Sequence, residues 1–101
     1  MDGDSAGFHE AAEKLSQKTC DLHRALVSLQ EELQAVDWYG QRIDATTDVE
    51  LKGILIHNRD EEKEHASMLL EWIRRADATW DTHLREFVFQ DGPIVETKKP
   101  A

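Results

Sequence analysis

The residues best suited to chemistry in this chain are Glu62 and His65, which stand in the middle of a helical pattern with mostly apolar ends. The Glu-x-x-His spacing places both side chains on one face of a helix, one turn apart. An ionised carboxylate buried between helices is costly unless it is compensated, and one metal ion would compensate both groups. The same spacing is half of the ligand motif of di-iron four-helix bundles. The pattern alternates steps of four and three residues through Leu51, Leu55, Asn58, Glu62, His65, Leu69, Trp72 and Ala76.

Other interpretations of this pair stay open, because Glu-x-x-His is common by chance. The two side chains could form a simple ion pair, or a polar patch that fixes the register of the helices. Glu61, four residues before His65, would replace Glu62 as a ligand if the helix phase differed. An oxygen-rich site with one nitrogen per metal suits Fe(II) or Mn(II) better than structural zinc. The chain has no His-Glu-x-x-His, which argues against a zinc metalloprotease.

A long first helix is expected over residues 8–39, with Gly40 ending it and residues 41–46 forming a loop. The basis is a second apolar pattern with steps of four and three, which is typical of helices that pack against other helices. Its members are Leu15, Thr19, Leu22, Leu26, Leu29, Leu33 and Val36.

A second long helix is expected over residues 48–75, because Thr47 and Glu50 have the spacing of a capping box. A short third helix should follow and stop before Gly92. The fold class is therefore all-α, with two long antiparallel helices and a short C-terminal helix. The third helix would carry Trp80, Leu84, Phe87 and Val88 on one side.

The domain organisation follows from these elements: a flexible N-terminus over 1–7, a helical hairpin with its third helix over 8–90, and a flexible tail over 91–101. A 30-residue helix is about 45 Å long, whereas a compact 100-residue globule has a radius of gyration of about 13 Å. Such a hairpin cannot cover its own core. We expect two copies to pair and complete a ferritin-like four-helix bundle.

The ligand count also favours pairing. The first helix offers Glu31 and Glu32 at mid-length, and Glu32 is the candidate that faces Glu62 and His65. One chain then supplies one Glu and one Glu-x-x-His, which is half of a di-iron centre. Two chains would supply four carboxylates and two imidazoles, and two Fe(II) ions per dimer would neutralise those carboxylates. Metal should therefore strengthen the dimer.

Composition narrows the classes of partner. The net charge is −9, from 21 acidic and 12 basic residues, which argues against nucleic acid and suits either cation attraction or a plain solvated acidic surface. The only cysteine, Cys20, allows no internal disulfide and fits a small packed side chain. No apolar run is long enough to span a membrane, and residues 1–7 lack the features of a signal peptide. A cytoplasmic location is expected.

Two segments resemble a known family. Residues 31–39, EELQAVDWY, are similar to the first-helix signature of the encapsulated ferritins. Residues 57–65, HNRDEEKEH, are similar to their second-helix signature, and LEWIRR at 70–75 follows as it does there. The resemblance extends over about residues 9–95.

The resemblance implies a two-helix ferritin relative that forms a ring-shaped decamer and oxidises Fe(II) to Fe(III) with oxygen at a centre on a dimer interface. It implies iron ligation by Glu32, Glu62 and His65 of each chain, with Tyr39 near the centre. It also implies that the protein works in an encapsulin nanocompartment, whose shell stores the mineral.

The resemblance further implies an outer metal-binding site at Glu31, Gln34 and Trp38, which would take Ca²⁺ or other divalent cations. The family usually has a glutamate where this sequence has Gln34, so cation capture there should be weaker. The family also carries a C-terminal shell-docking peptide, and residues 90–101 contain no recognisable one. Encapsulation is therefore expected from the family alone.

The functional prediction is a ferroxidase with a di-iron centre shared between two subunits. A di-iron peroxide reductase or oxygenase would use the same ligands. A non-catalytic helical interaction protein would bind no stoichiometric metal, and its assembly would not respond to a chelator.

Overall fold

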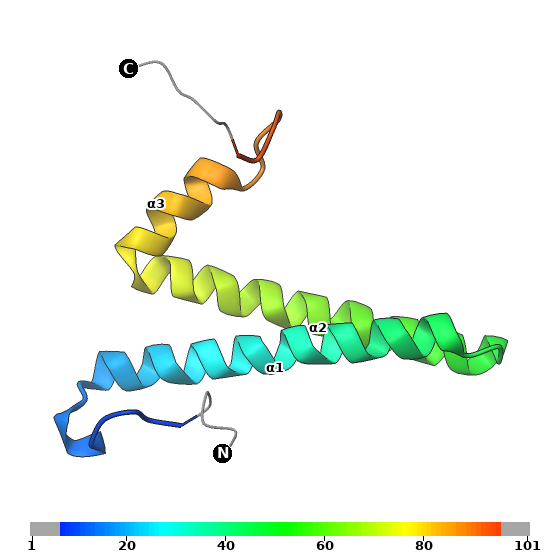
Figure 1. The fold of residues 1–101 in the computed structure, drawn as a ribbon, viewed down its shortest axis with the longest axis horizontal. Helices are drawn as coiled ribbons and strands as arrows, with labels where there is room; N and C mark the ends of the chain where they lie inside the picture. Colours follow the sequence, from blue (N-terminus) through cyan, green and yellow to red (C-terminus); the bar gives the residue numbers. More distant parts are fainter. Residues whose placement is uncertain (1–6, 96–101) are drawn as a thin grey trace.

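The computed structural model describes residues 7–95, and within that range the regular structure is entirely helical (Figure 1). A 3₁₀ turn, η2, covers Ala12–Lys14, and three α-helices follow. These are α1 over Gln17–Ala45, α2 over Val49–Ala76 and α3 over Ala78–Phe87. The predicted all-α fold of two long helices and one short helix is confirmed. The terminal tails predicted to be flexible fall mostly on 1–6 and 96–101, outside the described residues.

The first helix begins later than predicted, at Gln17 rather than near Phe8. Ser16 is its N-cap, and the Ser16 hydroxyl accepts a hydrogen bond from the Thr19 backbone N–H at 3.1 Å. An N-cap serine satisfies a backbone donor that the first helical turn leaves unpaired, which favours starting the helix there. The segment before Ser16 is not part of α1 but contacts it, since the centroids of the Phe8 and His23 rings lie 4.8 Å apart.

The first helix also ends later than predicted, since it passes through Gly40 and continues to Ala45. A glycine inside a helix costs only about 1 kcal/mol relative to alanine, and the flanking helical turns and the packing against α2 outweigh that cost. Most of the predicted loop at 41–46 is therefore helix. The Thr46 N–H closes it by donating to the Arg42 carbonyl at 3.0 Å.

The connection between α1 and α2 is only Thr46–Asp48, and it is built from side-chain caps. Asp48, rather than Thr47, is the N-cap of α2, and its Oδ1 accepts from the Leu51 N–H at 2.8 Å. The Asp48 N–H in turn donates to the Thr46 hydroxyl at 3.2 Å. A connection this short makes α1 and α2 antiparallel neighbours.

Asp77 alone separates α2 from α3. Its Oδ1 accepts from the backbone N–H groups of Thr79 at 2.9 Å and Trp80 at 3.1 Å, so it caps α3. Figure 1 shows α1 and α2 side by side, with α3 turning away from the end of α2. The radius of gyration is 17.8 Å, well above the ~13 Å of a compact globule of this length.

The described part of the chain buries almost nothing by itself. Ala25 at 5% and Ile73 at 0% relative exposure are the two buried hydrophobic residues in residues 7–95, and neither lies on the two predicted apolar patterns. Several residues of those patterns stay open: Leu26, Leu33, Leu51 and Trp72 are 38–56% exposed. Contiguous exposed apolar surface marks an interaction face. Among the described residues, no helix is both long and apolar enough to cross a bilayer.

Candidate metal centre

Glu32, Glu62 and His65 meet where the two long helices face each other. Glu32 and Glu62 stand equally far from Thr47, the middle residue of the connection, so the antiparallel pairing brings them opposite one another. His65 lies one turn further along α2 on the same face. Each residue offers one ligand atom, and these three atoms all lie within 4.8 Å of one another. The predicted grouping of these three side chains is therefore present in the fold.

The imidazole of His65 is the centre of this cluster. Its Nδ1 lies 2.9 Å from Glu32 Oε2 and 3.2 Å from Glu62 Oε1, so an Nδ1–H can donate to either carboxylate. Desolvation of the ring lowers the pKa of His65, but the hydrogen bond and charge of Glu32, together with those of Glu62, outweigh it and leave the pKa raised. The two carboxylates therefore favour the protonated form of His65.

The donor set fits a divalent metal ion of intermediate hardness. Two carboxylates and one imidazole within 4.8 Å offer oxygen and nitrogen ligands of the kind that Fe(II) and Mn(II) accept. The side chains of Glu32 and Glu62 are 20% and 22% exposed, and that of His65 is 47% exposed. The cluster is therefore open on one side. Three residues are fewer than a di-iron centre takes, and the open side leaves room for further ligands.

The alternative ligand Glu61 does not join the cluster. Its side chain is 54% exposed, and its Oε2 lies 3.4 Å from Nε2 of His57 on the same helix. The phase of α2 thus selects Glu62 over Glu61, and the phase of α1 selects Glu32 over Glu31, which is exposed. Both choices agree with the residues that the sequence analysis selected.

Tyr39 lies on α1 two turns beyond Glu32, about 10 Å along the helix axis, and is not a member of the three-residue cluster. It is partly buried, and the Arg42 guanidinium carbon sits 5.5 Å from the centre of its ring. A role for Tyr39 at the metal stays a prediction.

The predicted outer site lies on the exposed surface of α1. Glu31, Gln34 and Trp38 are all exposed, and their spacing places them along one side of the helix, away from the cluster. Trp38, with Gln41 and Arg42, lines a shallow hollow of about 320 Å³. The positive charge of Arg42 stands beside this surface. Metal binding there stays a prediction.

One polar feature was missed by the sequence reasoning. Glu71, Arg74, Arg75, Asp81 and Arg85 form a network of alternating charges at the end of α2 and the start of α3. Part of it was readable, since Glu71 with Arg74 and Arg75 has the i, i+3 and i, i+4 spacing of helical ion pairs. The link to Asp81 depends on how α3 turns, which spacing does not give.

Comparison with known proteins gives consistent matches along the chain. The sequence profile of the EncFtn-like family matches residues 7–91. The "Encapsulated ferritin-like protein" of Rhodospirillum rubrum is 61% identical over 90 residues, which is 89% of this chain and 64% of that protein. The "Ferritin-like protein" of Thermotoga maritima is 51% identical over 92 residues, covering 91% of this chain and 81% of the relative.

Two further matches are a less similar relative and a solved structure. The "Encapsulin nanocompartment cargo protein EncC" of Myxococcus xanthus is 37% identical over 82 residues, 80% of this chain and 62% of that protein. A crystal structure of a protein from Nitrosomonas europaea superposes with a TM-score of 0.85 at 57% identity, covering 89% of this chain and 99% of that one. The chain thus spans less than two thirds of the Rhodospirillum and Myxococcus proteins. The match over residues 7–91 and the identity to these relatives together show that the chain belongs to the EncFtn-like family.

Proposed function

We propose that this protein is a ferroxidase, which oxidises Fe(II) to Fe(III) with oxygen at a di-iron centre completed by two subunits. The observation that carries the proposal is the convergence of Glu32, Glu62 and His65, whose ligand atoms lie within 4.8 Å of one another at the middle of the hairpin. Membership of a ferritin-like family supports the same chemistry. Iron is the substrate, and each Fe(II) gives up one electron to dioxygen.

The centre needs a second copy for two physical reasons. One chain offers three ligand residues, half of what a di-iron bundle supplies. The same chain leaves Leu26, Leu33, Leu51 and Trp72 exposed on its long helices, and a second hairpin would cover such surface as the core of a four-helix bundle. A two-fold axis through this face would bring the two half-sites together.

The residues of the centre have separate tasks in this scheme. The carboxylates of Glu32 and Glu62 from both subunits would hold the ferrous ions. His65 would bind the metal as the neutral imidazole, so metal binding would release any proton that the ring carries. The open side of the cluster lets Fe(II) enter and Fe(III) leave. Tyr39 is placed along the same helix as a phenol that could supply an electron or a hydrogen bond.

The partners proposed for the protein come from its relatives. The Myxococcus relative is named as cargo of an encapsulin nanocompartment, and the Rhodospirillum relative as an encapsulated protein. We propose that this chain likewise works inside an encapsulin shell in the cytoplasm, assembled as a ring decamer of five dimers. Glu31, Gln34 and Trp38 would form an outer site for Ca²⁺ or other divalent cations.

A single experiment tests the central proposal. Crystals grown with Fe(II) would be measured at the iron absorption edge, and anomalous peaks are expected between the Glu32, Glu62 and His65 side chains of two chains. Oxygen and peroxide consumption would be followed in solution to separate a ferroxidase from a peroxide reductase. Absence of iron from these side chains, together with assembly that ignores chelators, would favour a non-catalytic interaction protein.

A further inference from the structure

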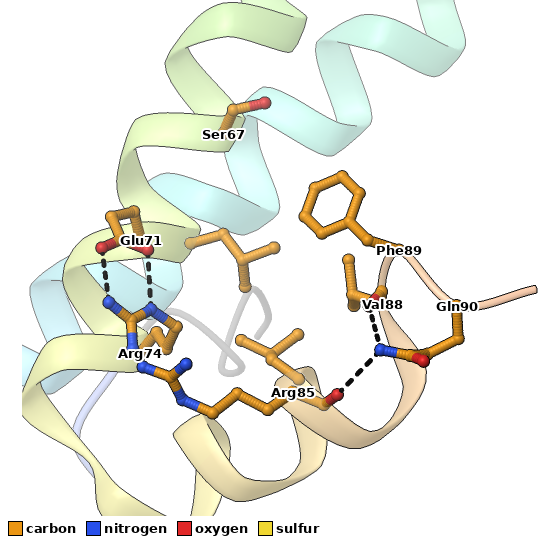
Figure 2. A pocket seen from close by; sticks show the side chains of 9 residues that line it. Ser67, Glu71, Arg74, Arg85, Val88, Phe89 and Gln90 are labelled. Atoms are coloured by element: carbon orange, nitrogen blue, oxygen red, sulfur yellow. Dashed lines mark hydrogen bonds and ion pairs between the residues drawn. The ribbon is translucent and has the colours of Figure 1, made fainter.

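A hollow of about 620 Å³ opens between the second half of α2 and helix α3 (Figure 2). Its walls are largely apolar: Leu70 comes from α2, Leu84 from α3, and Val88 from the segment that follows. Arg74 and Arg85 stand at its edge. Apolar walls that face each other across a gap favour closure, because closure removes both surfaces from water. The contacts that fix α3 relative to α2 therefore decide whether the hollow stays open.

The junction itself constrains α3 weakly. One residue, Asp77, ends α2 and begins α3, and its carboxylate bonds only to the first turn of α3. A cap of this kind fixes where the helix starts but not the direction in which it runs. Among the described helices, α3 makes its main packing contacts with α2, so contacts with α2 set its angle.

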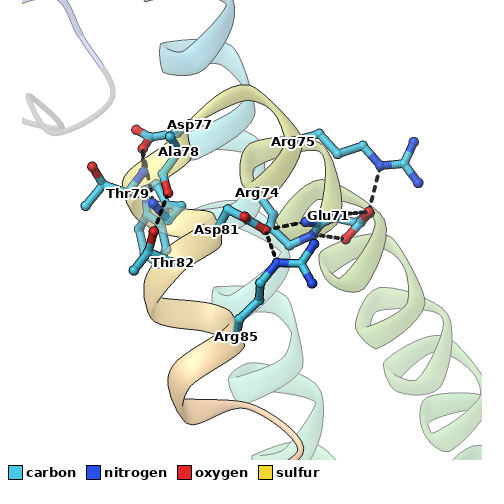
Figure 3. Close-up of polar contacts among 10 residues, drawn as sticks. Glu71, Arg74, Arg75, Asp77, Ala78, Thr79, Asp81, Thr82 and Arg85 are labelled. Atoms are coloured by element: carbon cyan, nitrogen blue, oxygen red, sulfur yellow. Dashed lines mark hydrogen bonds and ion pairs between the residues drawn. The ribbon is translucent and has the colours of Figure 1, made fainter.

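A chain of five charged side chains spans the junction (Figure 3). Arg74 donates to both oxygens of Glu71 on its own helix, from Nε at 2.8 Å and from Nη2 at 2.7 Å. Its remaining nitrogen, Nη1, donates to Asp81 Oδ1 on α3. Arg75 bonds the outer side of Glu71 at 2.6 Å, and Arg85 bonds the same Asp81 oxygen at 2.9 Å.

Arg74 is the member of this network that joins the two helices. Its guanidinium is planar with a fixed fork of donors, so two bonds to Glu71 fix the direction of the third. The Arg74 and Asp81 side chains are 25% and 33% exposed, which leaves their attraction less screened than that of a fully exposed pair. Glu71 thus aims Arg74, and Arg74 holds the first turn of α3.

We propose that the link Glu71–Arg74–Asp81 within this network is an ionic clamp that sets the angle between α2 and α3 and keeps the apolar hollow open. When the Arg74–Asp81 contact is removed, α3 pivots at Asp77 and closes toward α2. The clamp is thus a conformational device at the end of the hairpin remote from the α1–α2 connection. It is independent of the metal centre, and its failure would leave the proposed ferroxidase untouched.

The test is a distance measurement between α2 and α3 in the full chain. Nitroxide labels would be attached through Glu50→Cys and Glu86→Cys, both exposed positions, in a Cys20→Ser background. Labelled chain would be mixed with an excess of unlabelled chain, so that pulsed electron paramagnetic resonance reports distances within one molecule. The parent would be compared with Arg74→Gln, Asp81→Asn and the matched control Arg75→Gln, which removes an ion pair confined to α2.

The clamp predicts that Arg74→Gln and Asp81→Asn both shift the distance distribution to shorter values and broaden it, while Arg75→Gln reproduces the parent. Concentrated NaCl should shift the parent in the same direction. The proposal is overturned if Arg74→Gln and Asp81→Asn give the parental distribution with unchanged helicity, or if Arg75→Gln shifts as far as they do. If Arg74→Gln fails to fold, the partly exposed Asp81→Asn decides by the same criteria.

Discussion

The Nδ1 atom of His65 lies 2.9 Å from Oε2 of Glu32, and this contact joins the middle of α2 to the middle of α1. It is a contact between residues far apart in the sequence, made by groups that are costly to hold between helices unless they compensate each other. It shows that His65, a polar member of the second apolar pattern, pairs with a glutamate that lies beside Leu33 of the first pattern, and this pairing is the basis of the first prediction.

Removal of a proposed ligand should abolish oxidation. Glu62→Ala or His65→Ala should lower the ferroxidase rate by more than the roughly 10–100-fold loss typical of removing a group that only supports a ligand. The reason is that each variant takes a ligand from both half-sites of the dimer. Oxygen consumption with Fe(II) measures the effect. Glu61→Gln is the matched control, because Glu61 pairs with His57 outside the cluster, and it should keep parental turnover. Parental rates in both alanine variants would refute the assignment.

Metal removal should weaken the dimer. Ligands contributed by both chains link metal binding to association, so adding Fe(II) under anaerobic conditions should shift the protein to larger species, and a chelator should reverse the shift. Light scattering after size-exclusion chromatography measures this. Glu62→Ala should show no response to Fe(II). An assembly that is equally stable with and without chelator in the parent would argue against a shared centre.

Gln34→Glu should strengthen cation binding on the outer surface of α1. It restores one negative charge per chain beside Glu31 and Trp38, where the side chains are exposed. Calorimetric titration with Ca²⁺ should show higher affinity, and the initial oxidation rate should change. Gln17→Glu, which adds the same charge at the start of α1, is the control. The outer site would be the wrong assignment if both variants behaved alike.

Asp77→Ala should destabilise α3 by about 1 kcal/mol, the usual cost of losing an N-cap side chain. The carboxylate accepts from two backbone N–H groups, which alanine would leave without these partners. Thermal unfolding followed by circular dichroism measures the loss. Asp77→Asn retains a side-chain oxygen and should recover most of the stability. Equal stability of the alanine and asparagine variants would contradict the capping role.

Acid should release the ionic network at the α2–α3 junction. Hydrogen bonds from Arg74, and then from Arg75, hold the pKa of Glu71 at about 2, and Arg74 also lowers the pKa of Asp81. A lowered carboxyl pKa gives stability that is complete above the unfolded-state pKa and is lost as pH falls through the folded-state pKa. Distances between α2 and α3 should therefore be constant from neutral pH to about pH 5 and change only on further acidification. Asp81→Asn should lack part of that transition.

The sequence predicted which helices exist better than where they end. Periodic apolar residues identified the long helices, and the Glu62–His65 spacing together with the facing Glu32 identified all three clustered residues. The start at Gln17 was missed because the N-cap role of Ser16, whose hydroxyl accepts from the Thr19 N–H, was not recognised. The passage through Gly40 was missed because a modest propensity cost loses to the packing of a 29-residue helix.

The burial pattern was harder to predict for a related reason. Ala25 and Ile73 are the buried residues of the described range, yet neither belongs to the predicted apolar patterns. On each long helix, one row of side chains packs against the other helix of the hairpin, while neighbouring apolar residues remain exposed. The apolar periodicity of the sequence contains both sets of residues and does not separate them.

The equal distances of Glu32 and Glu62 from Thr47 restrict how this hairpin can change in length. One residue inserted between Glu32 and Thr47 would swing that carboxylate by about 100° around its axis and slide it by about 1.5 Å. A matching insertion between Thr47 and Glu62 would restore the alignment of the two carboxylates along the helices, but it would not restore their orientation around the helix axes. Insertions and deletions in natural variants should therefore gather before Glu32 and after His65, leaving the stretch between them constant in length.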